Sequence, residues 1–355
     1  MNDKNCPPNS RQRVAGVLRR MLSRQESVVF VVLIFEILLF SAIGRNFLAP
    51  DNVRNIVRHS VEIGLLALVM TPIILTGGID LSVGSMMGLC AVAFGMLWGE
   101  AHFAPWLAAC AAVAIGTAGG AINAGLITRL GLPPLIVTLG TFSLFRGLAE
   151  ALTGGSKSFT DFPDSFLSLG NSLAFGVPVQ AWVLVVVSLF VWGLVHRTTA
   201  GRAFRAIGFA PEGARYAGIP VGKRIAFAYT LAGAVAGLAA VIFVSRVGEA
   251  RANAGTGYEL AAITAVVLGG TSIFGGTGSV YGTLLGVASV AVLSNGLSRI
   301  LSISDISREL SGMLTGALLL VALAGGALTK ALAERPHRSK PADPVNSESA
   351  GRKEK

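Results

Sequence analysis

The stretch RTTAGRAFRAIGFAPEGARYAGIPVGKR, residues 197–224, is a polar interval between two long apolar segments. It carries six of the 29 Lys and Arg residues and a single acid, Glu212. Its turn residues predict two short helices, because Gly208 would end the first and Pro211 would open the second, which would end at Gly218. Glu212 falls in the first turn of the second helix, where the positive end of the helix dipole favours a carboxylate. A capped helix in a basic loop is well suited to being bound by another protein.

The composition of the whole chain is that of a membrane protein. Of its 355 residues, 52% are hydrophobic, only 14% are charged, and 44 are glycine, which lies outside the usual range for soluble domains. Apolar stretches of about 18–22 residues recur, and each is long enough to cross a hydrocarbon core of about 30 Å. The sequence lacks the period-two pattern of a membrane barrel, so helices are the expected spanning elements. We therefore expect an all-α polytopic membrane protein.

About ten transmembrane helices are predicted. With an even number of spans, both termini lie on the same side. Twenty Lys and Arg residues then share that side and eight lie on the other, so the positive-inside rule predicts an N-in, C-in topology. The predicted spans are roughly 27–45, 59–76, 81–98, 104–128, 133–153, 179–196, 224–245, 258–274, 279–298 and 309–330.

This topology divides the chain into three parts. Residues 1–26 form a basic cytoplasmic segment, which is too long and polar for a cleaved signal peptide. Residues 27–330 form the membrane domain, with the interval 197–224 in the cytoplasm and a periplasmic segment at 154–178. Residues 331–355 are rich in Pro, Ser, Lys and Glu, and we expect a disordered cytoplasmic tail.

A second informative stretch is TGGIDLSVGS, residues 76–85, which predicts an interrupted helix. Its two glycines release the helix, Asp80 follows among apolar residues, and two serines are placed to cap the helix that restarts. Asp80 is either a functional carboxylate at membrane depth or a cap of the third span at the inner interface. Both interpretations put the break near a translocation pathway or its gate. The candidate pathway residues are Gly77, Gly78, Asp80, Ser82, Ser85 and, from the fourth span, Asn123.

Two further patterns within the spans have structural explanations. Arg146 and Glu150 lie four residues apart, so we expect them to neutralise each other on one helix face. Small residues recur at four-residue spacing and predict close helix packing. They are Ala112, Gly116, Gly120 and Ala124 in the fourth span and Gly278, Gly282 and Gly286 in the ninth.

Catalytic chemistry is not indicated by the sequence. Residues 270–277 have the glycine density of a phosphate-binding loop, but Gly276 stands where that motif needs a lysine. No metal-ligand spacing or nucleophile–base pair can be assembled. The net charge of +10 comes mainly from basic residues that flank apolar segments, so we expect no nucleic-acid partner. We expect a non-enzymatic chain without a cofactor or metal of its own.

Three segments resemble those of a known family. GGIDLSVGS at 77–85, GRAFRAIGFAPEGARYAGIPVGKR at 201–224 and LGGTSIFGGTGSVYGTLLG at 268–286 are similar to the membrane permease subunits of ribose-type carbohydrate ABC importers. That group includes permeases for ribose, xylose, arabinose, rhamnose and autoinducer 2. The resemblance covers about residues 25–330 and implies the permease fold of an inner-membrane importer.

The resemblance also implies partners and a role for the interval 197–224. Such permeases work in pairs, as two copies or two paralogues, with a cytoplasmic ATPase, which binds ATP and Mg²⁺, and a periplasmic sugar-binding protein. Glu212-Gly213-Ala214 followed by Gly218 is similar to their Glu-Ala-Ala…Gly coupling motif, with Gly213 as a departure. The predicted ATPase-coupling residues are Arg205, Glu212, Ala214, Arg215, Tyr216, Gly218 and Ile219.

The expected function is therefore the import of a small sugar across a bacterial inner membrane, driven by a separate ATPase. The alternative is a secondary transporter driven by an ion gradient. The spans contain no chain of carboxylates and histidines for a proton relay, which argues against the alternative.

Overall fold

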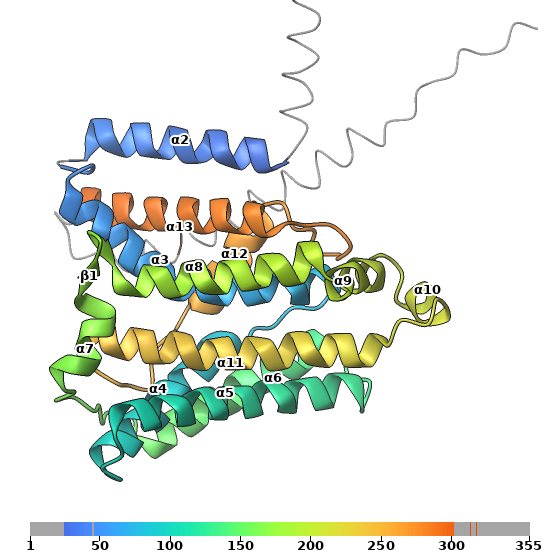
Figure 1. The fold of residues 1–355 in the computed structure, drawn as a ribbon, viewed down its shortest axis with the longest axis horizontal. Helices are drawn as coiled ribbons and strands as arrows, with labels where there is room; N and C mark the ends of the chain where they lie inside the picture. The colour runs from blue at the N-terminus through green and yellow to red at the C-terminus, as the bar shows by residue number, and fades with distance from the viewer. Residues whose placement is uncertain (1–24, 45, 302–312, 314–316, 318–355) are drawn as a thin grey trace, which may run out of the picture.

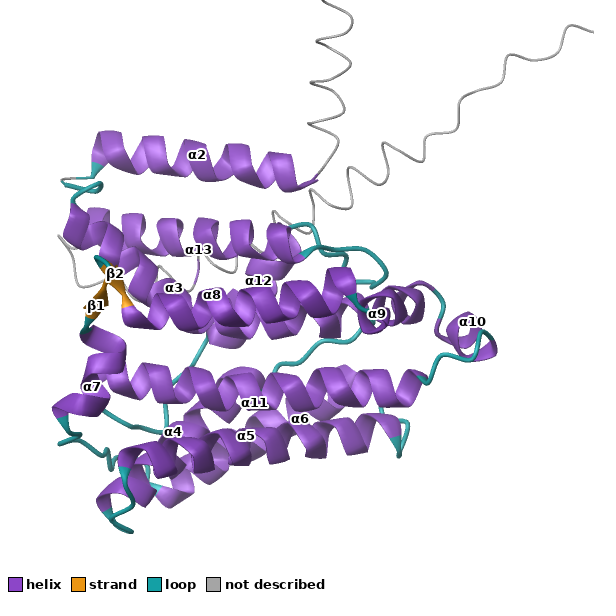
Figure 2. Cartoon of the chain, viewed as in Figure 1, coloured by secondary structure: helices purple, strands orange, loops and turns teal. Residues whose placement is uncertain are grey.

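The computed structural model describes residues 25–44, 46–301, 313 and 317. Helices dominate this part of the chain, and a two-stranded antiparallel hairpin pairs Leu173 with Pro178 and Ala174 with Val177 (Figure 2). The elements are α2 (Gln25–Ile43), α3 (Pro50–Leu75), α4 (Val83–Gly99), α5 (Pro105–Thr128), α6 (Pro134–Leu152), α7 (Asp164–Asn171), β1 (Leu173–Ala174), β2 (Val177–Pro178), α8 (Val179–Trp192), the π-helical turn η1 (Gly193–Arg197), α9 (Thr199–Phe209), α10 (Pro211–Tyr216), α11 (Val221–Val247), α12 (Tyr258–Leu268) and α13 (Val280–Leu301).

Seven helical stretches among the described residues are long and apolar enough to cross a membrane. The helices α4 and α12 have only 17 and 11 residues, which at 1.5 Å per residue is about 25 Å and about 16 Å. Both are shorter than a hydrocarbon core of about 30 Å. The tenth predicted span, 309–330, and the segments 1–26 and 331–355 lie wholly or almost wholly outside the described residues. The all-α polytopic class is confirmed, while ten spans and the N-in, C-in topology stay predictions.

The long helices run side by side, and the two polar segments lie at opposite ends of them (Figure 1). Helices α9 and α10 form one end, called here the α10 end. Helix α7 and the strands β1 and β2 lie at the other, called the hairpin end. By the predicted topology the α10 end is cytoplasmic. The segment 154–178 contains α7 and the hairpin.

Glycines bring α5 and α11 into backbone contact. A Cβ added to Gly116 would lie 2.3 Å from the Gly233 carbonyl oxygen, and one added to Gly120 would lie 2.4 Å from the Tyr229 carbonyl oxygen. A Cβ on Gly286 would likewise lie 1.9 Å from the Ala265 carbonyl oxygen, where α13 crosses α12. The prediction of close helix packing at these small residues is confirmed.

A buried ion pair joins α3 to α11. The Arg246 Nε donates to a Glu62 carboxylate oxygen at 2.7 Å, and the Glu62 side chain has no exposed surface. An uncompensated charge at this depth would be strongly unfavourable. The pair therefore fixes α3 and α11 in register near the hairpin end, where Arg246 lies in the last turn of α11.

Candidate membrane break and coupling helix

The break between α3 and α4 lies inside the helix bundle. The Tyr229 hydroxyl donates to the Ile79 carbonyl oxygen at 3.4 Å, and the Thr138 hydroxyl donates to the same oxygen at 3.2 Å. Tyr229 lies in the third turn of α11, about 12 Å along the helix from its start at Val221. The break is therefore enclosed by α6 and α11, with Thr138 in the second turn of α6 and Tyr229 in the third turn of α11.

Asp80 organises this turn. It is buried, and its Oδ1 accepts both the Ser82 backbone N–H at 2.8 Å and the Ser82 hydroxyl at 2.7 Å. The Asn123 amide of α5 then donates to the Ser82 hydroxyl oxygen at 2.8 Å. Hydrogen bonds therefore join Asp80 and Ser82 of the break to Asn123 of α5. That these residues line a translocation pathway stays a prediction.

The predicted serine caps are wrong. Ser82 precedes α4 but its hydroxyl makes no capping hydrogen bond, because it donates to Asp80 instead. The Ser85 hydroxyl donates back to the Ser82 carbonyl oxygen at 3.0 Å. The carboxylate of Asp80, rather than either serine, satisfies the backbone N–H at this helix start. Asp80 therefore takes the capping role at the start of α4 and is buried among the helices, while its depth in the membrane stays a prediction.

Glu150 attracts Arg146 as expected, but the two form no ion pair in the described part of the chain, and the Glu259 carboxylate attracts Arg146 more strongly. The Arg146 guanidinium donates to the Ala252 carbonyl oxygen in the segment between α11 and α12 and makes a longer contact, 3.5 Å, with that of Ala254. Those carbonyls need a donor because they are buried in an irregular segment within the bundle. Glu150 is exposed and faces a cavity instead. Helical spacing alone could not show a partner more than 100 residues away.

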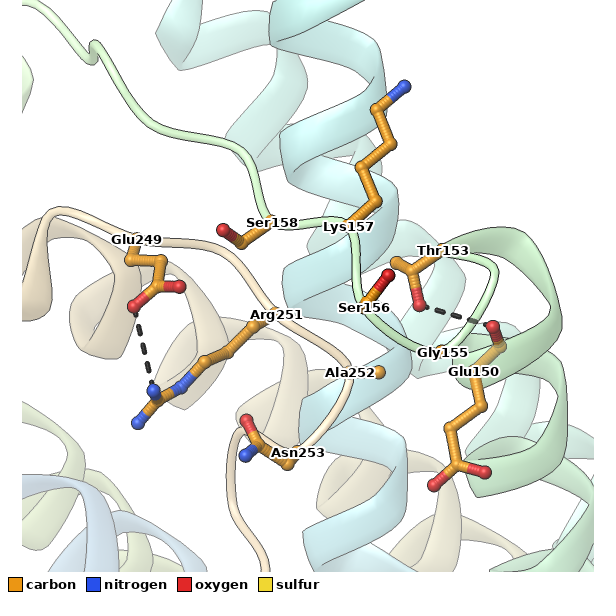
Figure 3. A pocket seen from close by; sticks show the side chains of 10 residues that line it. All are labelled: Glu150, Thr153, Gly155, Ser156, Lys157, Ser158, Glu249, Arg251, Ala252 and Asn253. Atoms are coloured by element: carbon orange, nitrogen blue, oxygen red, sulfur yellow. Dashed lines mark hydrogen bonds and ion pairs between the residues drawn. The ribbon is translucent and has the colours of Figure 1, made fainter.

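That cavity, of about 170 Å³, lies at the hairpin end and is lined by residues from 150–158 and 249–253. Glu249 and Arg251 pair across its edge at 3.5 Å (Figure 3). Reciprocal backbone hydrogen bonds between Phe159 and Ala250 hold the two lining segments together. The lining is polar and carries charges of both signs, and it was not identified from the sequence. The charged residues near the span ends were the only sequence signal.

The predicted coupling helix is α10, at the opposite end. Pro211 opens it, and Gly218, with φ of +80°, terminates it while the Ile219 N–H donates to the Ala214 carbonyl oxygen at 3.0 Å. Glu212 and Arg215 form an exposed ion pair at 3.1 Å. The Tyr216 side chain is 90% exposed. A helix this short is rigid only because its termini are fixed in this way.

Three of the predicted coupling residues face the protein itself. Ala214 is buried in a small cluster with Ile207 and Val221, and Ile219 packs against it. Arg205 donates to the Val195 carbonyl oxygen at 3.0 Å. Ala214 and Ile219 hold α10 on α9 and α11, and Arg205 holds α9 on η1. The surface that α10 offers to a partner consists of Glu212, Arg215, Tyr216 and the exposed Gly218.

The first helix of the interval does not end at Gly208. Helix α9 continues to Phe209, because Gly208 lies against the end of α3 rather than in a turn. A Cβ on Gly208 would lie 2.0 Å from the Leu75 carbonyl oxygen. The glycine is therefore needed for close approach. Leu75 is the last residue before the break, so the interval 197–224 touches the break directly.

Two comparisons place the chain among known proteins. Residues 52–323 match the family described as branched-chain amino acid transport system / permease component. The autoinducer 2 import system permease protein LsrD of Photorhabdus temperata is 37% identical over 309 residues, which cover 86% of this chain and 91% of that protein. The proteins of the same name from Yersinia pseudotuberculosis (strain PB1/+) and Salmonella paratyphi A are 37% and 38% identical, covering 86% and 84% of this chain and 91% and 90% of theirs.

Matches of this length and identity cover the break, the interval 197–224 and the Gly-rich turn before α13, the three segments on which the resemblance rests. They agree with the apolar helices of the structure. The chain therefore belongs to this family of transport permeases and is a non-catalytic, multi-pass inner-membrane subunit of the ribose-type ABC importer group.

Proposed function

We propose that this chain forms part of the pathway by which a bacterial ABC importer carries a small sugar or sugar-like compound into the cytoplasm. A separate ATPase subunit supplies the energy. A periplasmic binding protein delivers the substrate to the hairpin end, and a second permease, identical or paralogous, completes the pathway. The buried break around Asp80 and Asn123 forms part of the pathway or its gate.

The observation that carries this proposal is the direct contact between the interval 197–224 and the break. Helix α10 exposes Glu212, Arg215 and Tyr216, while its buried face is fixed to α9. Helix α9 in turn lies against the carbonyl of Leu75. A rigid helix bound by an ATPase can pass a rigid-body movement through these packed contacts to the break. A flexible loop could not.

The names of the relatives favour a substrate of this kind. Proteins at least 36% identical are named as autoinducer 2 import permeases, while the family description names branched-chain amino acids. Uptake of ribose, rhamnose, autoinducer 2 and leucine by cells that carry the importer distinguishes these classes. We expect uptake of one of the first three and none of leucine.

The coupling role has a direct test with a matched control. The tagged chain is purified with the ATPase that accompanies it, and Glu212→Ala and Gly218→Val are compared with Asp51→Ala. Asp51 also forms an exposed ion pair three residues away, with Arg54 at 3.0 Å, but at the hairpin end. We expect the first two variants to lose ATPase association and substrate-stimulated ATP hydrolysis, and the control to keep both. Intact association and hydrolysis in both α10 variants would refute the coupling role.

The alternative of ion-gradient transport makes the opposite prediction. It expects uptake to continue without any ATPase and to stop when an uncoupler collapses the gradient. We expect uptake to require the ATPase.

A further inference from the structure

The turn between α12 and α13 exposes a single large aromatic side chain at the α10 end. Phe274 is 84% exposed. The turn that presents it is closed by hydrogen bonds from the Ser272 N–H to the Thr277 carbonyl oxygen and from the Gly275 N–H to the Ser272 carbonyl oxygen, both 2.9 Å. Gly275 and Gly276 have φ of +87° and +81°, which other residues adopt only with strain. The backbone here is therefore held in one conformation.

This turn is seated on α9 and on the break. The ring of Phe209, itself 80% exposed, covers Gly276, where a Cβ would lie 2.8 Å from the ring. The Gly276 N–H donates to the Leu75 carbonyl oxygen at 2.9 Å. A Cβ on Gly275 would lie 2.8 Å from the Gly77 nitrogen. The turn is thus in backbone contact with both sides of the junction where α3 ends.

Phe209 and Phe274 form an exposed aromatic surface next to the helix that leads into α10. Exposed apolar surface beside charged residues marks an interaction site, and aromatic side chains in such places often contribute much of the binding energy. The exposed charges on the adjoining helices include Arg202 of α9 and the Glu212–Arg215 ion pair of α10, which together carry a net positive charge. The surface therefore fits an apolar groove with an acidic rim.

We propose that the turn 270–278 is a second docking contact for the ATPase subunit, with Phe274 inserted into an apolar groove beside the one that receives α10. This inference rests on the proposed coupling of α10 to an ATPase. A lipid headgroup region also accepts aromatic side chains, but it needs neither a hydrogen-bonded turn of fixed shape nor contact between that turn and the break. A rigid, backbone-seated anchor is what a partner that transmits force requires.

The second contact would reach the break by a route that does not pass through α10. Movement of the turn acts on Leu75 and Gly77 through the Gly276 hydrogen bond and the Gly275 contact. The ATPase would then act on both flanks of the α3 end, through α9 on one side and the turn on the other.

Site-specific photocrosslinking tests the docking contact. Benzoylphenylalanine is placed in turn at Tyr216, Phe274 and Phe175 in the full chain, co-expressed with its ATPase. Phe175 is 96% exposed but lies at the hairpin end, in the β1–β2 turn. We expect ATPase crosslinks from positions 216 and 274 and none from position 175.

The outcomes separate the two proposals. A crosslink from position 216 with none from position 274, or with only lipid adducts there, overturns the second contact and leaves the coupling role of α10 standing. No ATPase crosslink from either position overturns both. A crosslink from all three positions signals non-specific capture and counts against the second contact.

Affinity provides an independent measurement. In the purified complex, Phe274→Ala should weaken ATPase binding about 10-fold, the effect expected for loss of one aromatic anchor. Phe175→Ala should leave the affinity unchanged. If Phe274→Ala binds the ATPase with an affinity within about twofold of that of the unchanged chain, the proposal is overturned, because an aromatic anchor contributes more than that.

Discussion

Removal of the Asp80 carboxylate should destabilise the break and stop transport. The Asp80→Ala variant leaves the Ser82 N–H and hydroxyl without the acceptor that they contact at 2.8 and 2.7 Å. Each hydrogen bond to a charged group contributes about 1.5–3 kcal/mol, and both donors would stay buried. We therefore expect a loss of about 3–5 kcal/mol in the free energy of unfolding.

The Asp80→Asn variant separates hydrogen bonding from charge. The asparagine oxygen can still accept from both Ser82 donors, so only the charge assistance is lost, and we expect a cost of about 1–2 kcal/mol. Equilibrium unfolding in mixed detergent micelles measures both values. Asp161→Asn, which removes the charge of an exposed carboxylate hydrogen-bonded to Thr160 at a φ of +61° that asparagine also tolerates, is the control and should change stability by less than about 0.5 kcal/mol.

Uptake of the transported substrate is measured with the same variants. We expect Asp80→Asn to retain substantial uptake and Asp80→Ala to lose it, because the turn geometry is what the carboxylate maintains. Equal loss of uptake in both variants, with stability kept in Asp80→Asn, would show that the negative charge itself is needed. Unchanged stability in Asp80→Ala would refute the structural argument altogether.

Three further predictions concern contacts between helices. Arg246→Met should destabilise the protein by about 3–5 kcal/mol, because it leaves the buried Glu62 charge uncompensated. Unfolding measurements on the double variant Glu62→Gln/Arg246→Met should show that most of the lost free energy of unfolding is regained. Gly233→Val should reduce the amount of folded, monodisperse protein on size-exclusion chromatography, because a Cβ there lies 2.1 Å from the Gly116 carbonyl oxygen; an unchanged profile would contradict the close crossing. Arg146→Met should release the segment 252–254. A cysteine introduced at position 253, in a background without native cysteines, should then react faster with a hydrophilic maleimide. An unchanged rate would show that other contacts hold the segment.

Local spacing was a good guide wherever the relevant interaction was local. The caps of α10 at Pro211 and Gly218 follow from turn chemistry that operates within a few residues. Ala214 and Ile219 fall in the same stretch, but their inward orientation depends on the neighbouring helices. Spacing could identify the helix and could not say which of its side chains a partner would meet.

The sequence by itself determined that this is an all-α membrane protein, because long apolar stretches can satisfy their backbone groups in lipid only as helices. It also located the break at residues 77–85 and the short helix after Pro211, since glycine and proline act on the backbone at their own positions. Only the tertiary structure decided what these elements touch. Arg146 contacts the segment 252–254, Gly208 contacts Leu75, and the turn 270–278 contacts both Gly208 and Leu75. Each of these contacts joins residues that are far apart in the chain. Such contacts depend on which helices are neighbours, and the spacing of residues along one helix can predict close packing without showing which helix it packs against.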